Sequence, residues 1–319
     1  MLKDRCAVID VRRLALLREV SIYGGLTGAA EVLGMSVSSI SQQLSRLQNE
    51  LGVSLLEPAG RGVRLTADAE RLVVHTERVL AVLEEAEAEL LLTRGGLSGV
   101  VRVAAFHTFG TRLLVPAMRR LREVAPNLAL EYAQLDPEGA IRELGARRAD
   151  IAVADEYPGA PLSPTPGLVR VDLGHDPIAM YLPDGMREAD LSGGSSVDSL
   201  ARLPWVMEPR QTDAYRWARG ICRTIGFEPR VAFESASLDF HRQLVASGEA
   251  AAFLPRSIAG ELSGQVTRLP GRRGLPGGMH RTFLMLMRRG AERTPALMAC
   301  REAIEGAYRE LGTEPAGGT

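Results

Sequence analysis

The hydrophobic positions between residues 36 and 48 recur with the period of an α-helix. Ile40, Leu44 and Leu47 are spaced by four and three residues, so they fall on one face of a predicted helix. Ser36 stands just before this helix, where its hydroxyl can accept a hydrogen bond from an unpaired amide of the first turn. The opposite face carries short, uncharged polar side chains, and these are Ser38, Ser39, Ser41, Gln42 and Ser45. The pattern predicts an amphipathic helix whose outer face can hydrogen-bond a partner or solvent.

A shorter helix is predicted immediately upstream. Thr27 is expected to cap a helix over residues 28–33, and Gly34 to end it in a sharp turn. Two helices joined by a tight turn form a helix-turn-helix, whose second helix can present polar groups to the base edges of DNA. The same residues are also compatible with a helical hairpin whose serines are only solvated, because this geometry is common in domains without a DNA role.

A β-hairpin is predicted after the second helix. Residues 53–56 form a short apolar run, residues 58–62 a turn and residues 63–65 a returning strand. Arg61 and Arg64 lie on this hairpin, where a wing would meet DNA phosphates. The hairpin therefore favours DNA binding over the solvated interpretation.

Residues 67 to about 94 are predicted to form one long helix, capped by Thr66. The positions with a three-four spacing are Leu72, Val79, Leu83, Ala86 and Leu90, with Thr76 in the gap. A helix of about 28 residues with a narrow apolar seam is too long for one small domain. We expect it to join two copies of the chain, the alternative being that it packs on its own domain.

From residue 100 the pattern changes to alternating strands and helices. Strands are predicted at residues 100–106, 128–135 and 151–154, separated by helices that begin at residues 108 and 137. This order predicts a parallel sheet covered by helices. Further strands are predicted at residues 169–173, 177–182, 205–207, 231–234, 251–254 and 280–288, with helices at residues 213–225, 238–247 and 295–311.

The run from Leu26 to Thr66 resembles the winged helix-turn-helix of the LysR-type transcriptional regulators. The matching features are Gly25-Leu26-Thr27, Ala29-Ala30, Leu33, Ser36, Ser41, Gln43, Leu47, Glu50-Leu51-Gly52, Leu55-Leu56 and the run from Arg61 to Thr66. Residues 200–206, 226–230 and 245–255 are similar to the effector-binding domain of the same family. The departures are Val37 where the family most often has Gln, Gln42 where Arg or His is common, and Glu57-Pro58 in place of a usual Glu-Arg pair. The base sequence that this helix reads is therefore not given by the resemblance.

The resemblance implies an α/β fold with an α-rich N-terminal part. It implies a winged helix-turn-helix DNA-binding domain at residues 1–66, a linker and dimerisation helix at residues 67–94, and an effector-binding domain at residues 95–319 that is similar in fold to periplasmic binding proteins. Lobe I of that domain is expected at about residues 100–168 plus 279–311, and lobe II at about residues 169–270. The implied partners are double-stranded promoter DNA, a small-molecule effector and further copies of the chain, as a homodimer through the linker helix and then a homotetramer. RNA polymerase is a further candidate partner.

Candidate site residues follow from these elements. For DNA they are Thr27, Ser36, Val37, Ser38, Ser39, Ser41, Gln42, Ser45, Arg46, Arg61 and Arg64. For an effector, the rule is that ligands bind beyond the carboxyl ends of the strands of an open α/β sheet. The candidates at these ends are His107, Thr108, Phe109, Gln134, Asp136, Asp155, Glu208, Gln211, Thr212, Ser235, Ser237 and Pro255. Each of them has a structural alternative, such as a helix cap for Thr108 or Thr212.

Charge and cysteine content narrow the functional classes. The 319 residues carry a net charge of −1, and the first 94 contain 11 Lys and Arg against 13 Asp and Glu. DNA affinity therefore needs a local positive face, not bulk charge. Asp136, Asp155 and Glu208 argue against a polyanionic effector. The three cysteines form no CxxC pair, which fits a reducing cytoplasm and leaves a redox role for Cys222 open.

The absence of common catalytic motifs argues against an enzyme. The sequence contains no GxSxG, GxGxxG, P-loop or HExxH motif, and its five histidines are scattered. We therefore expect no cofactor and no metal site. The N-terminus does not resemble a signal peptide and no run of eighteen apolar residues occurs, so we expect a cytoplasmic protein without a membrane partner. The alternative is a cytosolic ligand-binding protein of the periplasmic-binding-protein fold without DNA regulation, which leaves the first 94 residues unexplained.

Overall fold

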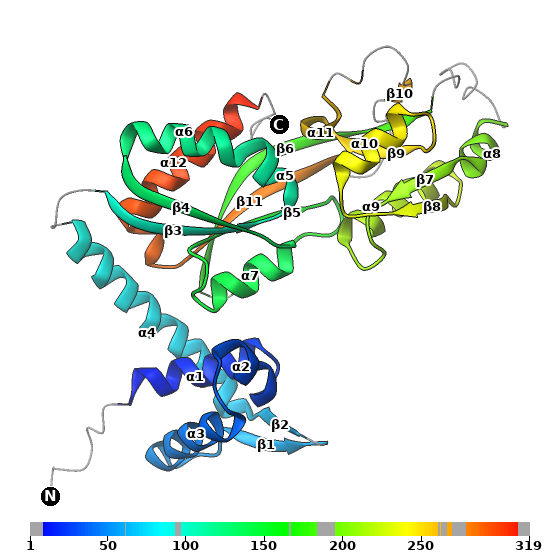
Figure 1. The fold of residues 1–319 in the computed structure, drawn as a ribbon. Coiled ribbons are helices and arrows are strands. Elements are labelled where there is room, and N and C mark those ends of the chain that lie inside the picture. The colour runs from blue at the N-terminus through cyan, green and yellow to red at the C-terminus, as the bar shows by residue number, and fades with distance from the viewer. Residues whose placement is uncertain are drawn as a thin grey trace, which may run out of the picture.

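The computed structural model describes residues 9–60, 62–92, 97–165, 167–183, 195–260, 262, 267–269 and 279–311. A small N-terminal domain, a long helix and an α/β domain of two lobes follow one another along the chain (Figure 1). Among the helices of these residues, none is both long enough and apolar enough to cross a bilayer.

Three helices and a hairpin make up the N-terminal domain. They are α1 (Val11–Ile22), α2 (Leu26–Leu33), α3 (Val37–Leu51), β1 (Leu56–Ala59) and β2 (Gly62–Leu65). Ile40, Leu44 and Leu47 of α3 are fully buried in one core cluster with Leu17 and Val20 of α1. The predicted apolar face of α3 is thereby confirmed.

Of the two predicted helix caps, Ser36 is confirmed and Thr27 is not. Ser36 does cap α3, since its Oγ accepts a hydrogen bond from the amide of Ser39 at 3.1 Å. The helix α2, however, begins at Leu26, and its N-cap is Gly25 at a φ of 135°, a conformation that favours glycine. Thr27 lies inside the first turn and is exposed, so its prediction as the cap is wrong.

The long predicted helix is α4 (Ala67–Leu92), and Thr66 caps it by accepting a hydrogen bond from the amide of Ala69 at 3.2 Å. One face packs on the same chain, and its buried residues are Ala69, Thr76, Leu80, Ala81, Glu84 and Ala88. The stripe on the other side is exposed and consists of Val79, Val82, Leu83, Ala86 and Leu90. Thr76 therefore belongs to the inner face, not to the seam in which the sequence places it.

A mixed sheet forms the first lobe. β3 (Ser98–Ala105) lies between β4 (Asn127–Gln134) and β5 (Ile151–Glu156), and the three strands are parallel, as predicted. β11 (His280–Arg288) pairs antiparallel with β5, and α12 (Pro295–Glu310) packs on α6 (Val115–Val124). The C-terminal part thus returns to this lobe. The other helical segments here are α5 (His107–Phe109), the π-helical η1 (Gly110–Leu114), α7 (Pro137–Gly145) and the 3-10 turn η3 (Ala291–Arg293).

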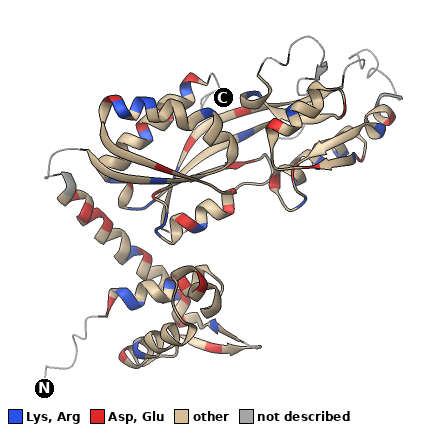
Figure 2. Cartoon of the chain, in the orientation of Figure 1, with Lys and Arg blue, Asp and Glu red and all other residues tan. Residues whose placement is uncertain are grey.

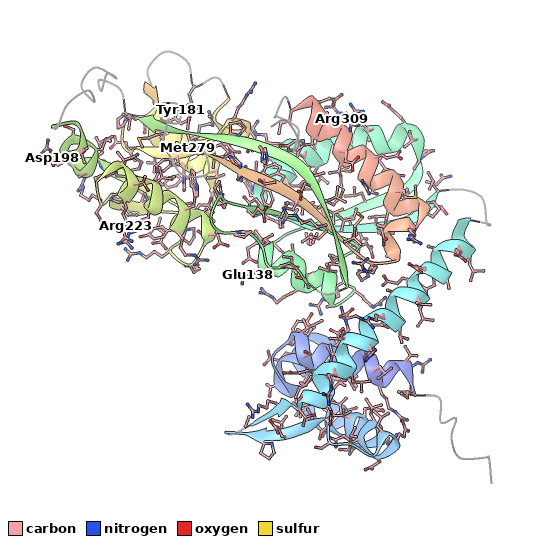
Figure 3. The ribbon with its side chains drawn as sticks, turned by 180° about the vertical axis from the view of Figure 1, so that it is seen from behind. Glu138, Tyr181, Asp198, Arg223, Met279 and Arg309 are labelled. Carbon is pink, nitrogen blue, oxygen red and sulfur yellow. The ribbon has the colours of Figure 1, made fainter. Side chains whose placement is uncertain are left out.

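One strand, β6 (Leu168–Leu182), runs through both lobes where the sequence predicts two strands. Its first part pairs with β11 in the first lobe, and its second part pairs with β9 (Ala252–Pro255) and β10 (Thr267–Leu269). The other elements of the second lobe are α8 (Ser195–Arg202), β7 (Pro204–Met207), α9 (Asp213–Ile225), β8 (Arg230–Glu234), α10 (Leu238–Ala246) and α11 (Arg256–Ala259). Figure 3 shows Tyr181, Met279, Asp198 and Arg223 in this lobe, and Glu138 and Arg309 in the first.

Each lobe has its own aromatic core. In the first, Phe283 packs edge to face against Tyr308 at a centroid distance of 5.7 Å. In the second, Trp205 stacks on Phe253 at 5.5 Å and donates a hydrogen bond from Nε1 to the carbonyl of Leu200 at 2.9 Å. Each lobe is therefore stabilised by its own core.

Candidate functional site

The outer face of α3 carries the polar groups that the sequence places there. Val37, Ser38, Gln42, Ser45 and Arg46 are exposed, and Ser39 and Ser41 are half-buried. The hydroxyls and the amide can donate to and accept from base edges in a major groove. Val37, with 42% of its surface exposed, offers an apolar contact of the kind that a thymine methyl group accepts.

The wing is formed by β1 and β2, and Arg64 is the one of its two predicted phosphate contacts that the structure describes. Arg64 is exposed, but its Nε donates to Glu57 Oε1 at 2.7 Å, so part of its charge is compensated. Arg61 lies outside the described residues. Pro58, which the sequence places in the turn, belongs to β1 and pairs with Val63.

Arg46 is the basic residue of α3, and it is exposed. Within the described part of the chain, no ion pair involves its guanidinium. The side chain of Gln48, by contrast, stabilises the fold: its Oε1 accepts hydrogen bonds from the amides of Leu55 at 2.8 Å and Leu56 at 3.1 Å. Figure 2 shows acidic residues gathered on the half of α4 farther from the N-terminal domain, away from α3. Among the described residues of α3 and the wing, Arg46 and Arg64 are the exposed basic groups.

His107 of the first lobe contacts the second lobe. Its Nε2 lies 3.1 Å from Asp239 Oδ2 on α10, and its Nδ1 lies 3.2 Å from Gln134 Oε1 at the end of β4. Two of the predicted candidates, His107 and Gln134, are thus brought together at the carboxyl ends of β3 and β4. Asp239, which sequence reasoning did not select, approaches them from the second lobe.

A buried ionic network lies where β6 and β11 pass between the lobes. Arg281 is 1% exposed, and its Nε and Nη2 donate to Asp176 Oδ2 at 3.1 and 3.0 Å. Its Nη1 donates to Asp155 Oδ2 at 3.2 Å, and the Tyr157 hydroxyl donates to the same oxygen at 3.3 Å. Ser257 donates its hydroxyl to Asp176. Burial raises the pKa of Asp155, while Arg281 counteracts that rise.

A cavity of about 30 Å³ adjoins this network on the side of the second lobe. Tyr157, Trp217 and Phe253 are its aromatic lining residues, and aliphatic side chains from β6, β7, α9 and α10 complete most of the wall. Two predicted candidates, Glu208 at the end of β7 and Pro255 at the end of β9, also line it. The strand-end rule therefore selected residues of a real cavity.

Glu208 is the charged residue among those that line the cavity. Burial raises the pKa of Glu208 to about 8, the nearby Asp155 adds to the rise, and Arg281 opposes it. Within the described residues, no hydrogen bond or ion pair involves its carboxyl group.

His241 also lines the cavity, and its Nε2 donates to the carbonyl of Ser235 at 2.8 Å. Burial lowers the pKa of His241, so the ring is neutral and its Nδ1 is an acceptor.

Several predicted effector residues serve the local fold. Phe109 is fully buried in the core of the first lobe, so its prediction as a cleft residue is wrong. Thr108 is 2% exposed and lies within α5, whose N-cap is Phe106, so Thr108 does not cap this helix as expected. Three others act as N-caps: Asp136 accepts from the amide of Gly139, Thr212 from that of Tyr215 and Ser237 from that of Phe240. Gln211 is exposed and is not part of the cavity wall.

Sequence reasoning did not select Asp176, Arg281, Tyr157 or Trp217. Arg281 did leave a signal, because it is a charged residue close to the apolar run Phe283–Met287 of β11, and a buried charge requires a partner. Asp176 left a weaker one, because other charged residues of β6, such as Arg170 and Asp172, have the same sequence pattern. Tyr157 and Trp217 left none, since an aromatic residue that lines a cavity has the same sequence pattern as one in a core.

The burial of Cys222 argues against the redox role that the sequence leaves open for it. Cys222 and Cys300 are both fully buried, and burial raises the pKa of each thiol to about 12. Because the thiolate is the reactive form, neither residue is suited to redox sensing. Within the part of the chain that the structure describes, no group of three or more His, Cys, Asp or Glu side chains is arranged to hold a metal ion.

Two family profiles match the chain over most of its length. The profile described as "Bacterial regulatory helix-turn-helix protein, lysR family" matches residues 11–70. The profile described as "LysR substrate binding domain" matches residues 94–309. The first match includes α3 and the wing, and the second includes both lobes.

Individual relatives agree with these profiles. The chain is 27% identical over 255 residues to the "Probable HTH-type transcriptional regulator LrrA" of Synechococcus elongatus, covering 79% of this chain and 82% of the relative. It is 26% identical over 306 residues to the "Nitrogen assimilation regulatory protein nac" of Klebsiella aerogenes, covering 93% and 94%. The solved structure of a full-length OxyR variant from Pseudomonas aeruginosa has a TM-score of 0.58 at 21% identity, covering 92% of this chain and 94% of that one, and shares its fold.

Proposed function

The chain belongs to the LysR family and is a DNA-binding transcriptional regulator with an effector-binding domain, and on that premise we propose a role for each of its parts. α3 and the wing contact one half-site of double-stranded promoter DNA. A second copy, held through α4, contacts the other half-site. A small molecule bound between the lobes favours one arrangement of the assembly over another, and this controls transcription.

The outer face of α3 is the single observation that carries the DNA-binding part of this proposal. One face of the helix is fully buried at Ile40, Leu44 and Leu47, so the hydroxyl and amide groups necessarily point outward. We assign base contacts to this face, and phosphate contacts to Arg46 and Arg64. Because these contacts are mostly uncharged, sequence discrimination depends on hydrogen bonding and shape more than on charge.

The exposed stripe of α4 supports a dimer. Val82 and Leu90 are 62% and 66% exposed, and Val79 and Leu83 lie on the same stripe, while the inner face of the helix is already covered by its own chain. A second copy of α4 would bury this stripe. Two copies also double the phosphate contacts that one copy can make. A homotetramer built from such dimers, contact with RNA polymerase and action in the cytoplasm are further parts of the proposal.

The cavity beside Arg281 and the contact of His107 with Asp239 support an effector site. His107 and Asp239 belong to different lobes and are in contact. A ligand that moves one lobe relative to the other would therefore change this contact. The cavity lies at the ends of β7 and β9, where the second lobe faces the buried network. We place the effector here, with Glu208 and Pro255 among its contacts.

A gel shift with DNA from upstream of the chain's own gene tests the function. We expect the purified protein to retard this fragment specifically, in the presence of excess unrelated DNA. The double variant Ser41→Ala with Gln42→Ala removes two polar groups from the outer face of α3 and should weaken specific binding by about 100-fold, at roughly 1–3 kcal/mol for each lost base contact. Size-exclusion chromatography should show an unchanged oligomer.

A control variant removes the same number of polar side chains elsewhere. Thr224→Ala with Ser247→Ala alters two exposed residues of the second lobe and should leave DNA affinity unchanged. No retardation of any neighbouring promoter at low salt would contradict the proposed function. Equal loss of affinity in both double variants would contradict the assignment to α3.

A further inference from the structure

The aromatic lining of the cavity is suited to a positively charged ligand. The rings of Tyr157 and Trp217 lie with centroids 5.5 Å apart, and those of Trp217 and Phe253 lie 5.6 Å apart, so the three form one continuous group. All three line the cavity. The face of an aromatic ring carries negative potential and attracts a cation within about 6 Å of its centroid.

The free polar atoms near these rings are mainly acceptors. Glu208 and His241 both line the cavity. The Nε2 of His241 donates to the carbonyl of Ser235, which leaves Nδ1 of the neutral ring as an acceptor. The nearby guanidinium of Arg281 is not available to an anion, because its nitrogens already donate to Asp155, Asp176 and Ser257. A ligand rich in donors therefore fits, and a carboxylate does not.

The balance of charge around the cavity leads to the same conclusion. Arg281 is the positive group of the network, and it is paired with two carboxylates, Asp155 and Asp176. Glu208 adds a third carboxyl group on the cavity side. Once Glu208 is ionised, the negative charges exceed the positive one by two, and a bound cation would reduce that excess.

Trp217 contributes the one donor that needs a partner among the residues lining the cavity. Trp217 is 8% exposed, and its Nε1 is buried with no hydrogen-bond partner in the described structure. A buried N–H without an acceptor is costly. A ligand that carries an acceptor oxygen beside its cationic group would satisfy this donor.

We propose that the effector cavity binds a small organic cation, an amine whose ammonium group lies against Glu208 and whose apolar body lies along Tyr157, Trp217 and Phe253. A volume of about 30 Å³ exceeds what one water molecule needs and accommodates an ammonium or methylammonium head group. This inference rests on the proposed function only for the ligand's role as an effector, and not for its binding.

Calorimetric titration of the full-length protein without DNA tests the inference. The probes are benzylamine, benzyl alcohol and benzoate, which share a ring and differ in charge. At pH 8 we expect benzylamine to bind at least tenfold more tightly than benzyl alcohol, and benzoate more weakly than either. Glu208→Gln should reduce this preference for benzylamine by about tenfold, because only the charged probe loses an ion pair, and its effect on benzyl alcohol should be the smaller one.

A matched control is available on the neighbouring strand. Glu234 lies opposite Met207 in the register of β7 and β8, but its side chain is 42% exposed and is paired with Arg210. Glu234→Gln should bind all three probes as the wild type does.

The pH dependence gives a readout that a purely structural role of Glu208 would not produce. The charged and titratable groups that interact with Glu208 are Asp155, Tyr157 and Arg281. Asp176 is bonded to Arg281, and His241 of α10 lines the same cavity. Because Glu208 must ionise to pair with an ammonium group, wild-type affinity for benzylamine should rise about tenfold from pH 6.5 to pH 8. The Glu208→Gln variant should lack this rise.

Tighter binding of benzoate than of benzylamine, or binding of none of the probes, would overturn the inference. Failure of the proposed function has a different signature, since a protein that binds benzylamine but retards no promoter fragment loses only its role as a regulator. A change in the gel shift on adding benzylamine, absent in Glu208→Gln, would connect the two.

Discussion

Arg288 of β11 donates a hydrogen bond from Nε to Oε1 of Glu84 on α4 at 2.8 Å, and this pair joins the effector-binding domain to the linker helix. The Glu84 side chain is 7% exposed and also pairs with Arg147. Arg288 pairs further with Asp150 at 3.0 Å. The position of α4 against the first lobe is therefore fixed by buried charges, which require close pairing to be stable.

Replacing Glu84 tests the strength of this connection. Glu84→Gln keeps the shape of the side chain but leaves two guanidinium groups without their shared carboxylate. We expect the free energy of unfolding to fall by about 2–3 kcal/mol, somewhat less than for a fully buried pair because Arg288 retains Asp150. Urea unfolding measures the change. Glu87→Gln, at an exposed position of the same helix, should cost less than about 0.5 kcal/mol, and equal losses in the two variants would contradict this account.

Gly290 marks a second close contact between the same parts. A Cβ at this position would lie 2.4 Å from the carbonyl oxygen of Ala81 on α4, and the residue has a φ of 94°. Gly290→Ala should therefore lower the free energy of unfolding by more than about 2 kcal/mol, from backbone strain and overlap together. Gly248→Ala is the control, because Gly248 has a φ of 79° but no atom within 4 Å of an added Cβ. It should cost about 1 kcal/mol from the backbone alone, and a loss at Gly290 no larger than this would show that the loop can move away from α4.

Periodicity was sufficient for most of the fold, since local patterns specify helices and strands. The three-four spacing of Ile40, Leu44 and Leu47 gave the buried face of α3, and the strand-helix alternation after residue 100 gave the parallel strands of the first lobe. The predictions that are wrong concern elements whose extent depends on their tertiary contacts. Leu168–Leu182 was divided into two strands because a glycine and charged residues interrupt its apolar pattern, whereas partner strands on both sides keep it continuous.

The candidate site was predictable only in part. The strand-end rule selected Glu208 and Pro255, because it depends on the direction of the chain alone. It also selected Phe109, which turns into the core, since the rule does not say which way a side chain points. Arg281 and Asp176 are far apart in the sequence, and only the pairing of β11 with β6 places them opposite each other.

The exposed stripe of α4 gives a prediction about assembly. Leu83→Glu places a carboxylate in the middle of the stripe, where a second α4 would have to bury it unpaired. We expect the dissociation constant of the dimer to rise at least 100-fold, about 3 kcal/mol, with the helical content unchanged. Light scattering coupled to size-exclusion chromatography measures the mass. Val74→Glu is the control on the same helix, at an exposed position off the stripe. A monomer in both variants, or in neither, would argue against dimerisation through this stripe.

The raised pKa of Glu208 predicts how stability depends on pH. In the folded protein this pKa is about 8, against 4.5 for an ordinary glutamate, so the folded state holds a proton that the unfolded state releases between these values. The contribution of this group to stability is complete below pH 4.5 and is lost as the pH rises to about 8. Glu208→Gln cannot ionise and should be more stable than the wild type at pH 8.5, by about 4–5 kcal/mol, while at pH 5 the difference should be below about 1 kcal/mol. Thermal unfolding at the two pH values measures this difference, with Glu234→Gln expected to follow the wild type at both. A Glu208→Gln variant that is less stable than the wild type at pH 8.5 would mean that the ionised carboxylate has a stabilising partner, and the cavity would then have no unpaired acid to offer a cation.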